Sequence, residues 1–301
     1  MALTGHEEAD ALRADIRACC ASEWRMVFPE PLLERGLVIV AHPDDESIAC
    51  GALLQRMAEP MLAYCTDGAP YDPYFWKQRY GSREAYAELR REETRTAMAH
   101  MGVADFVFLA DHPHARGVLA DQQLFRNLEA AFELLSRLIN ERRPTALLTS
   151  AYEGGHPDHD CCNFLTAQLS RRFSVPAFEA PLYTRAHSQD SLKAGVQRFI
   201  TNEGPVIDVQ PTDEEAQRKV RMCGAYESQG DFLRIFDVRR EILRPLPDHD
   251  YSRPPHMGKL NYEAWQWTMT GADVCAAFGH FAAKHGDMQP QQATSGSGQR
   301  V

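Results

Sequence analysis

The sequence predicts an α/β fold, with a doubly wound, mostly parallel sheet and helices on both of its faces. Short apolar runs alternate along the first half of the chain with longer segments of helical periodicity, which favours a parallel sheet. The run at 37–41 is short, rich in Val and Ile, and free of polar residues, which is typical of a strand buried on both faces. Ligands of such sheets bind beyond the carboxyl ends of the strands, where the strand order switches.

The individual elements follow in chain order. Strands are expected over 37–41, 61–66, 106–109 and 146–150, with weaker signals at 177–183 and 206–209. Helices are expected over 9–21, 47–57, 82–101, 121–142, 159–173 and 212–226. Acidic residues just before the second helix suit the positive end of its dipole. Gly102 is a suitable end for the long third helix, and Thr212 is a suitable cap for the last.

These elements suggest one main domain with two flanking segments. We expect an N-terminal helical extension over 1–35, a single main domain over 36–288, and a tail over 289–301. The tail is rich in Gln, Ser and Gly, a composition typical of disorder.

Composition and charge exclude several classes of protein. The 44% hydrophobic and 25% charged residues are ordinary for a globular protein. A net charge of −10 argues against bulk nucleic-acid binding, which needs clustered Lys and Arg. No apolar run approaches the length of a membrane helix, and the start of the chain has no signal-peptide pattern. Eight cysteines without a C-x-x-C pair favour reduced thiols, so we expect a cytoplasmic protein.

Two segments rich in His and Asp carry the chemistry. The first, Ala-His-Pro-Asp-Asp-Glu at 41–46, follows the first strand, and the second, Gly-His-Pro-Asp-His-Asp at 155–160, follows the fourth. Either segment alone is more often turn or capping chemistry. Because both fall at strand carboxyl ends, the pair predicts a single active site.

A zinc site is the simplest use of these side chains. Catalytic zinc takes three N or O ligands and leaves a position for water, and His42, Asp45 and His159 supply such a set. The metal lowers the pKa of that water towards about 7. Asp44 is then the candidate general base.

Two more residues of the second segment are candidates for catalytic roles. His156 is placed to stabilise the oxyanion and to protonate the leaving nitrogen. Asp158 is the candidate that orients His156.

Both segments resemble the signatures of the LmbE-like, or PIG-L, N-acetylglucosaminyl deacetylases. The long helix, with its Arg90-x-x-Glu93 pattern, the Thr-Asp-Gly turn at 66–68 and the Tyr-Glu-Ser-Gln sequence at 226–229 are also similar. The likeness covers roughly residues 36 to 230. It implies a Rossmann-like domain that binds one Zn²⁺ through the same three ligands, with Fe²⁺ as the ion of some members in cells. It further implies that Arg90 contacts the substrate.

Several other residues are weaker candidates for roles at this site. Asp67 and Asp111 follow the second and third strands, so each is a candidate for substrate binding as well as for a turn. His112 and His114 are more often surface residues than a second metal site. The aromatic residues at 71–80 could be a lid that stacks on a sugar ring, or ordinary packing.

For Trp265 and Trp267 we expect a structural role. Tryptophans at such positions are more often core residues than ligand contacts.

The sequence thus predicts a zinc-dependent hydrolase that removes an N-acyl group, most simply acetyl, from an amino sugar or related small molecule. Two alternatives remain. One is a metal-dependent esterase or phosphoesterase, and the other is a non-enzymatic small-molecule binding module on the same fold. The substrate's identity is not readable from the sequence, and oligomerisation is left open.

Overall fold

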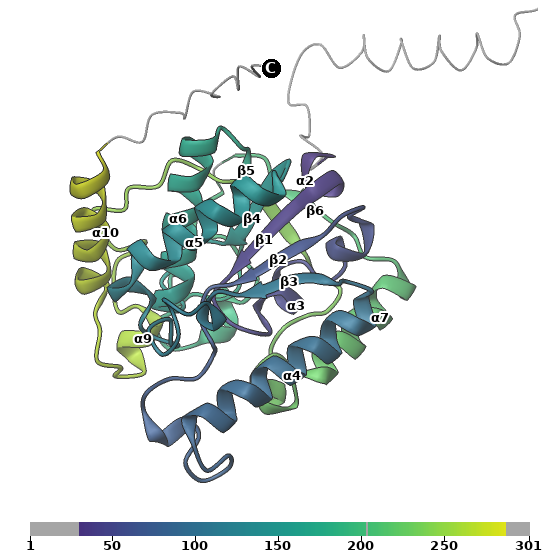
Figure 1. The fold of residues 1–301 in the computed structure, drawn as a ribbon, viewed down its shortest axis with the longest axis horizontal. Coiled ribbons are helices and arrows are strands. Elements are labelled where there is room, and N and C mark those ends of the chain that lie inside the picture. Colours follow the sequence, from purple (N-terminus) through teal and green to yellow (C-terminus); the bar gives the residue numbers. More distant parts are fainter. Residues whose placement is uncertain (1–29, 203, 287–301) are drawn as a thin grey trace, which may run out of the picture.

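The computed structural model describes residues 30–202 and 204–286, and within them a single twisted sheet forms the centre of the molecule (Figure 1). The strand order is β3-β2-β1-β4-β5-β7-β6. The strands are β1 (Gly36–Val40), β2 (Met61–Tyr64), β3 (Asp105–Phe108), β4 (Ala146–Ser150), β5 (Ala177–Ala180), β6 (Ile207–Asp208) and β7 (Ile242–Pro245).

The first five strands pair in parallel, whereas β7 pairs antiparallel with both β5 and β6. The doubly wound, mostly parallel sheet predicted from the sequence is therefore confirmed. The chain crosses from β1 to β2 and β3 on one side and to β4 and β5 on the other. The switch in strand order consequently lies between β1 and β4.

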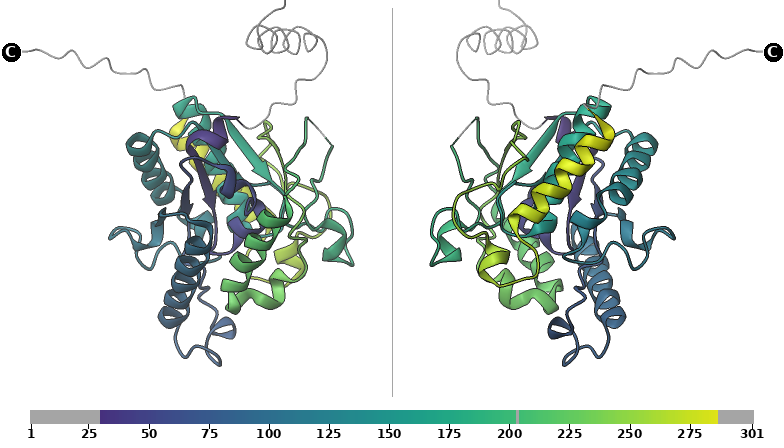
Figure 2. Two further views of the ribbon diagram at one scale, coloured as in Figure 1. Left: turned by 90° about the vertical axis from the view of Figure 1, so that its right-hand side faces the viewer. Right: turned by 90° about the vertical axis from the view of Figure 1, so that its left-hand side faces the viewer.

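Helices cover both faces of the sheet, as the edge-on views show (Figure 2). The α-helices are α2 (Glu30–Arg35), α3 (Asp45–Ala49), α4 (Arg83–Met101), α5 (Leu128–Arg142), α6 (Pro157–Phe173), α7 (Asp213–Ala225), α8 (Gly230–Leu233), α9 (Asn261–Ala264) and α10 (Gly271–His285). Short 3-10 turns include η1 (Leu53–Arg56), η2 (Pro73–Phe75), η3 (Leu109–Asp111), η4 (Leu124–Arg126), η5 (Leu192–Gly195) and η6 (Glu227–Gln229).

Alternate side chains of the central strand β1 pack in two separate hydrophobic cores. Leu37 and Ile39 of β1 pack in one core with α5, α6 and α10. Val38 and Val40 pack in the other with α3, α4 and α7. Since successive strand residues point to opposite faces, an unbroken apolar strand is what such a two-sided arrangement requires.

Two predicted helices are wrong in their extent. The helix expected at 47–57 ends at Ala49, and only η1 follows. The amides of Ala52 and Leu53 donate to the buried carboxylate of Glu241, at 2.5 and 3.0 Å, instead of to carbonyls one turn back. The helix expected from residue 121 starts at Leu128, because residues 121–127 form a loop and η4.

Other boundaries agree closely with the sequence. Gly102 ends α4 in the left-handed conformation at φ 71°, and Thr212 forms a capping box with Glu215 at the start of α7. Strand β7 and helices α9 and α10 were not predicted. The expected helix at 9–21 and the tail at 289–301 lie outside the described residues. None of the helices within the described ranges is long and apolar enough to cross a membrane.

A buried ion pair joins α7 to the loop before β7. Lys219 Nζ lies 2.6 Å from Glu241 Oε1, and both side chains are almost fully shielded from solvent. We expect Lys219→Met to lower the free energy of unfolding by about 3–5 kcal/mol, because it leaves the Glu241 carboxylate buried without its cation. Denaturant unfolding measures this loss.

The matched control is the exposed pair of Arg218 and Glu214 on the same helix, 2.8 Å apart. Arg218→Ala is expected to cost less than about 1 kcal/mol, because exposed ion pairs contribute little. Equal losses from the two variants would contradict the structural role of the buried pair.

Candidate active site

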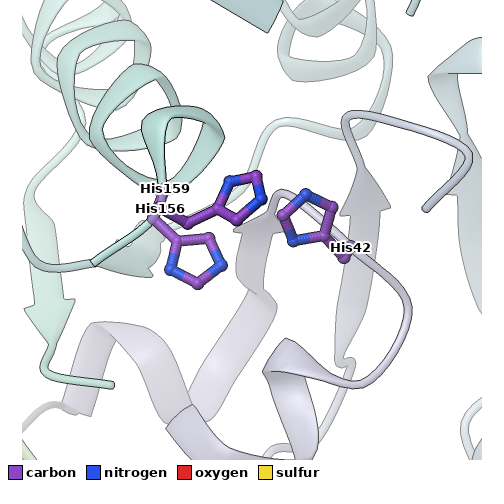
Figure 3. A group of neighbouring side chains, drawn as sticks. All are labelled: His42, His156 and His159. Atoms are coloured by element: carbon purple, nitrogen blue, oxygen red, sulfur yellow. The ribbon is translucent and has the colours of Figure 1, made fainter. Parts of the chain in front are cut away.

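Three histidines converge at the switch point between β1 and β4 (Figure 3). His42 lies in the turn after β1, His156 caps the start of α6, and His159 lies in the first turn of that helix. One ring nitrogen of each histidine lies within 4.8 Å of one ring nitrogen of the other two. The two segments that the sequence singled out therefore meet, although more than a hundred residues separate them.

Asp45 connects two of these histidines. Its Oδ1 lies 3.1 Å from His159 Nε2, and its Oδ2 lies 3.4 Å from His42 Nδ1. The backbone amide of His42 also donates to Asp45 Oδ2 at 2.8 Å. The side chains expected to hold a metal are thus gathered in one buried cluster.

Asp121 also belongs to the cluster, although nothing in the sequence pattern singled it out. Its Oδ1 lies 3.3 Å from His42 Nε2 and 3.2 Å from His156 Nε2. With Asp158, these side chains form a second group with metal-binding spacing. An Asp at an apparent helix start is usually a cap, so no local signal separates it from many others.

The carboxylate of Asp158 pairs with His42, and the residue reaches the His156 ring through its backbone amide. Its Oδ2 lies 3.3 Å from His42 Nε2, and its two oxygens accept the amides of Gln122 and Leu124. The backbone amide of Asp158 donates to Nδ1 of His156 at 3.1 Å. In neutral His156 this bond leaves the ring proton on Nε2, which faces Asp121 and the cavity.

Asp44 is a buried carboxyl beside a buried arginine. Arg90 Nη2 lies 3.2 Å from Asp44 Oδ1, and the same nitrogen donates to the Pro43 carbonyl. Burial raises the pKa of Asp44 to about 7, although the positive charge of Arg90 opposes the shift. A carboxyl that titrates near neutrality is suited to accept and return a proton.

The backbone at Asp44 is strained. Its φ is 114°, in a region that side chains other than glycine rarely adopt. Such strain persists where the surroundings hold it in place, and it is common at functional sites.

The charges of the cluster shift the pKa values of its members in different directions. Burial alone would lower the pKa of His42, but the charges of Asp121 and Asp45 raise it well above its usual value. Burial would raise the pKa of Asp45, yet His159 and His42 hold it well below its usual range. Burial and the charge of His42 lower the pKa of His156.

A divalent cation fits this arrangement. Nδ1 of His159 is buried without a hydrogen-bond partner, and its Nε2 faces the Asp45 carboxylate, 3.1 Å away. Orphaned buried nitrogens are costly, and nearby carboxylates supply the negative charge that a metal needs. The donor set of imidazoles and carboxylates is one that suits Zn²⁺ and Fe²⁺.

These side chains line a cavity of about 250 Å³, whose wall also includes Arg90, Tyr183, Phe75, Trp265 and Trp267. The two tryptophans therefore border the site, whereas the sequence favoured a core position. Tyr183, whose ring lies 5.5 Å from that of His159, was also missed because it follows a short strand with no polar motif.

Two other predicted substrate contacts lie outside this wall. Asp67 is ion-paired with Arg83 and accepts the amide of Ala69. Asp111 is exposed and pairs with Arg91 at 2.6 Å. The rings of His112 and His114 lie 5.4 Å apart in an exposed loop. A direct contact of either aspartate with substrate stays a prediction.

The known proteins to which this chain is similar are deacetylases. Residues 37–170 match the PIG-L family, described as GlcNAc-PI de-N-acetylase. A 1D-myo-inositol 2-acetamido-2-deoxy-alpha-D-glucopyranoside deacetylase of Nocardioides sp. is 29% identical over 54% of this chain and 66% of its own. The protein of the same name from Thermomonospora curvata is 30% identical over 60% of this chain and 69% of its own.

A solved structure shares the fold. A deacetylase of the teicoplanin biosynthetic pathway superposes with a TM-score of 0.56 at 20% identity, over 70% of this chain and 97% of its own. The matches to the curated relatives above span about two thirds of those proteins' length. The family match contains both His- and Asp-rich segments and the strands that bring them together. On this combined evidence, the chain belongs to the PIG-L family.

Proposed function

We propose that this chain is a metal-dependent N-deacetylase acting on an N-acetylated amino sugar in a small conjugate. The observation that carries the proposal is the buried cluster in which Asp45 lies 3.4 Å from His42 and 3.1 Å from His159, beside Asp44, in a chain that belongs to the PIG-L family. The related proteins named above are deacetylases of an acetamido sugar linked to inositol. We propose one domain over 36–288, in keeping with the continuous sheet.

The metal is proposed to be held by His42, Asp45 and His159, with Zn²⁺ the first choice and Fe²⁺ accepted by the same donors. A bound divalent ion supplies Lewis acidity and makes a water molecule acidic enough to deprotonate near neutral pH. The surrounding carboxylates and the buried His159 ring, whose Nε2 faces Asp45, support this assignment.

We assign the proton transfers and the stabilisation of negative charge to Asp44 and His156. Asp44 accepts a proton from the attacking water, whose oxygen forms a bond to the acyl carbon. His156 presents Nε2–H to the cavity and stabilises the developing negative charge on the carbonyl oxygen. The C–N bond then breaks, and the leaving nitrogen takes the proton that Asp44 accepted, or one from His156 when that ring enters the reaction as an imidazolium. The products are acetate and the free amine.

Arg90 has a supporting place in this proposal. Its guanidinium lies in the cavity wall and 3.2 Å from Asp44, so it sets the charge around the base and faces the substrate. Burial would lower the pKa of Arg90, but Asp44 and Tyr86 raise it, and the group stays charged.

We also propose a cytoplasmic location. The six cysteines within the described ranges are all free thiols, five of them buried, which fits a reducing compartment.

The proposed activity is tested with a panel of acylated amino sugars, simple amides, esters and phosphoesters, assayed before and after removal of metal by a chelator. We expect release of free amine from N-acetyl amino sugars, loss of at least about 90% of that rate after chelation because water activation depends on the ion, and recovery on adding Zn²⁺. Faster hydrolysis of esters or phosphoesters, or full activity in the metal-free protein, would contradict the proposal.

A further inference from the structure

Two residues of the catalytic cavity wall, Tyr86 and Gln229, have no role in the proposed reaction. Both line the cavity beside Arg90. Tyr86 and Arg90 lie one turn apart on α4, and Gln229 lies in η6, which follows α7. Helices α4 and α7 pack side by side (Figure 1). The Tyr-Glu-Ser-Gln sequence at 226–229 thus contributes its last residue to the cavity wall.

A chain of hydrogen bonds behind this wall begins at a carboxylate. Glu93 Oε1 accepts the backbone amide of Ser228 at 2.7 Å, and Glu93 Oε2 accepts the Ser228 hydroxyl at 2.6 Å. Because a carboxylate has no proton to donate, the Ser228 hydroxyl is the donor of the second bond. Its oxygen is then left to accept, and Gln229 Nε2 lies 2.9 Å from it. Only the nitrogen of an amide side chain donates, so this contact fixes the orientation of the Gln229 amide.

The same amide nitrogen fixes the role of the Tyr86 oxygen. Gln229 Nε2 lies 2.7 Å from that oxygen, and Arg90 Nη1 lies 3.3 Å from it. Both groups donate, since a guanidinium has no acceptor atom. The Tyr86 oxygen therefore accepts two hydrogen bonds and keeps one proton to donate. Among the described residues none accepts that proton, so it is available to a molecule in the cavity.

The Tyr86 ring is fixed in place before any ligand arrives. Only 6% of the residue is exposed. The ring stacks in parallel on that of Tyr80, with the ring centres 4.5 Å apart, and it packs in a small core with Ala69 and Ala87. A donor that is already ordered costs little entropy when it binds a ligand.

Arg90 separates the Tyr86 hydroxyl from the general base. Its Nη2 is the nitrogen near Asp44, whereas its Nη1 is the nitrogen near Tyr86. In the proposed reaction the acyl group lies beside Asp44. The Tyr86 hydroxyl consequently faces a part of the substrate away from the scissile bond, where a sugar offers hydroxyl oxygens that accept hydrogen bonds.

We infer that Tyr86 is a substrate-binding residue whose hydroxyl donates to one hydroxyl oxygen of the sugar ring, and that Ser228 and Gln229 position it by fixing the direction of its proton. This inference rests on the proposed function, because it takes the molecule in the cavity to be an N-acetylated sugar. It gives the sequence at 226–229 a role in recognition, although Ser228 itself does not line the cavity.

The test compares Tyr86→Phe with the wild type on N-acetylglucosamine and on its deoxy analogues, each of which lacks one ring hydroxyl. We expect Tyr86→Phe to lower kcat/KM for N-acetylglucosamine by about three- to tenfold, the usual range for one neutral hydrogen bond. The loss should fall on KM, because the bond is made away from the reacting atoms. For one deoxy analogue the two proteins should have the same kcat/KM, since either change removes the same bond.

Ser228→Ala tests the direction of the proton. Without the serine oxygen the Gln229 amide is free to turn its own oxygen towards Tyr86 and accept the phenol proton. We expect a loss of about two- to threefold for N-acetylglucosamine, a fraction of one hydrogen bond, and none for the analogue that Tyr86→Phe identifies. Equal losses on both sugars would overturn the positioning role, because a merely structural change does not distinguish them.

Tyr262→Phe is the matched control. It removes a buried hydroxyl that has no hydrogen-bond partner and lies outside the cavity wall. All ratios between sugars should stay at the wild-type values. The inference is overturned if Tyr86→Phe leaves kcat/KM for N-acetylglucosamine unchanged, or lowers it equally for N-acetylglucosamine and every deoxy analogue.

A binding measurement separates this inference from the proposed function. If the zinc-loaded protein does not deacetylate N-acetylglucosamine, calorimetric titration with that sugar replaces the rate. Binding that Tyr86→Phe weakens by about three- to tenfold, but not for one deoxy analogue, would leave the inference standing while the proposed function fails. Deacetylation without this selectivity means that the inference fails alone, and the absence of both turnover and binding overturns both.

Discussion

Asp44→Asn is expected to lower kcat by about 10²- to 10⁴-fold, the usual contribution of a positioned general base. Asparagine has nearly the shape of the carboxyl but cannot accept the proton of the attacking water. Asp44 is not among the proposed metal ligands, so bound zinc should remain stoichiometric. Elemental analysis and steady-state kinetics on the same preparation measure both quantities.

The matched control is Asp105→Asn, which removes a half-buried carboxylate that lies 3.3 Å from Arg142 and does not line the cavity. Its kcat should stay within about twofold of the wild type, as expected for a surface substitution. Because Arg90 loses its partner in Asp44→Asn, thermal unfolding checks that the loss of rate is not a loss of fold. A fully active, folded Asp44→Asn enzyme would remove Asp44 from the mechanism.

The parts of the fold that the sequence predicted well are those with strong local signals. Strand β4 has the predicted bounds, and α4 runs from its Ser82 cap to Gly102 as expected. The catalytic motifs could be paired because the carboxyl ends of parallel strands meet at one edge of a sheet. Local sequence patterns and the topology of parallel sheets were together enough to predict that His42 lies near His159.

The failures arise where a distant side chain replaces a local hydrogen-bond partner. The carboxylate of Glu241, almost 190 residues away, takes the amides that a longer α3 would have used. In the same way, Asp158 accepts the amides of Gln122 and Leu124, which keeps residues 121–127 out of α5 and brings Asp121 into the site. No window of neighbouring residues contains this information.

Strand β7 was not predicted for a similar reason. It contains a Pro and a charged residue, Arg244, which argue against an interior strand. Arg244 is buried because its Nε donates to the buried Glu179 carboxylate at 2.8 Å. A charge partner more than sixty residues away thus makes a polar sequence acceptable inside the sheet.

His159→Gln is expected to reduce the affinity for zinc by more than about 100-fold, because the loss of a direct ligand should exceed the 10- to 100-fold cost of losing an outer partner. Glutamine fills similar space but offers only a weak ligand atom. The protein should therefore purify with far less than stoichiometric metal, and added zinc should restore little activity. Elemental analysis and competition with a chromogenic chelator measure the change.

Asp121→Asn is the variant that decides between the two donor groups around His42. If His42, Asp45 and His159 hold the metal, Asp121 acts through the imidazoles of His42 and His156, 3.3 and 3.2 Å away, and its loss should weaken zinc binding by only about 10- to 100-fold. If the group of His42, Asp121, His156 and Asp158 holds it instead, Asp121→Asn should empty the site while His159→Gln stays loaded. The second outcome would move the ion away from Asp45, and with it the reason for placing the base at Asp44.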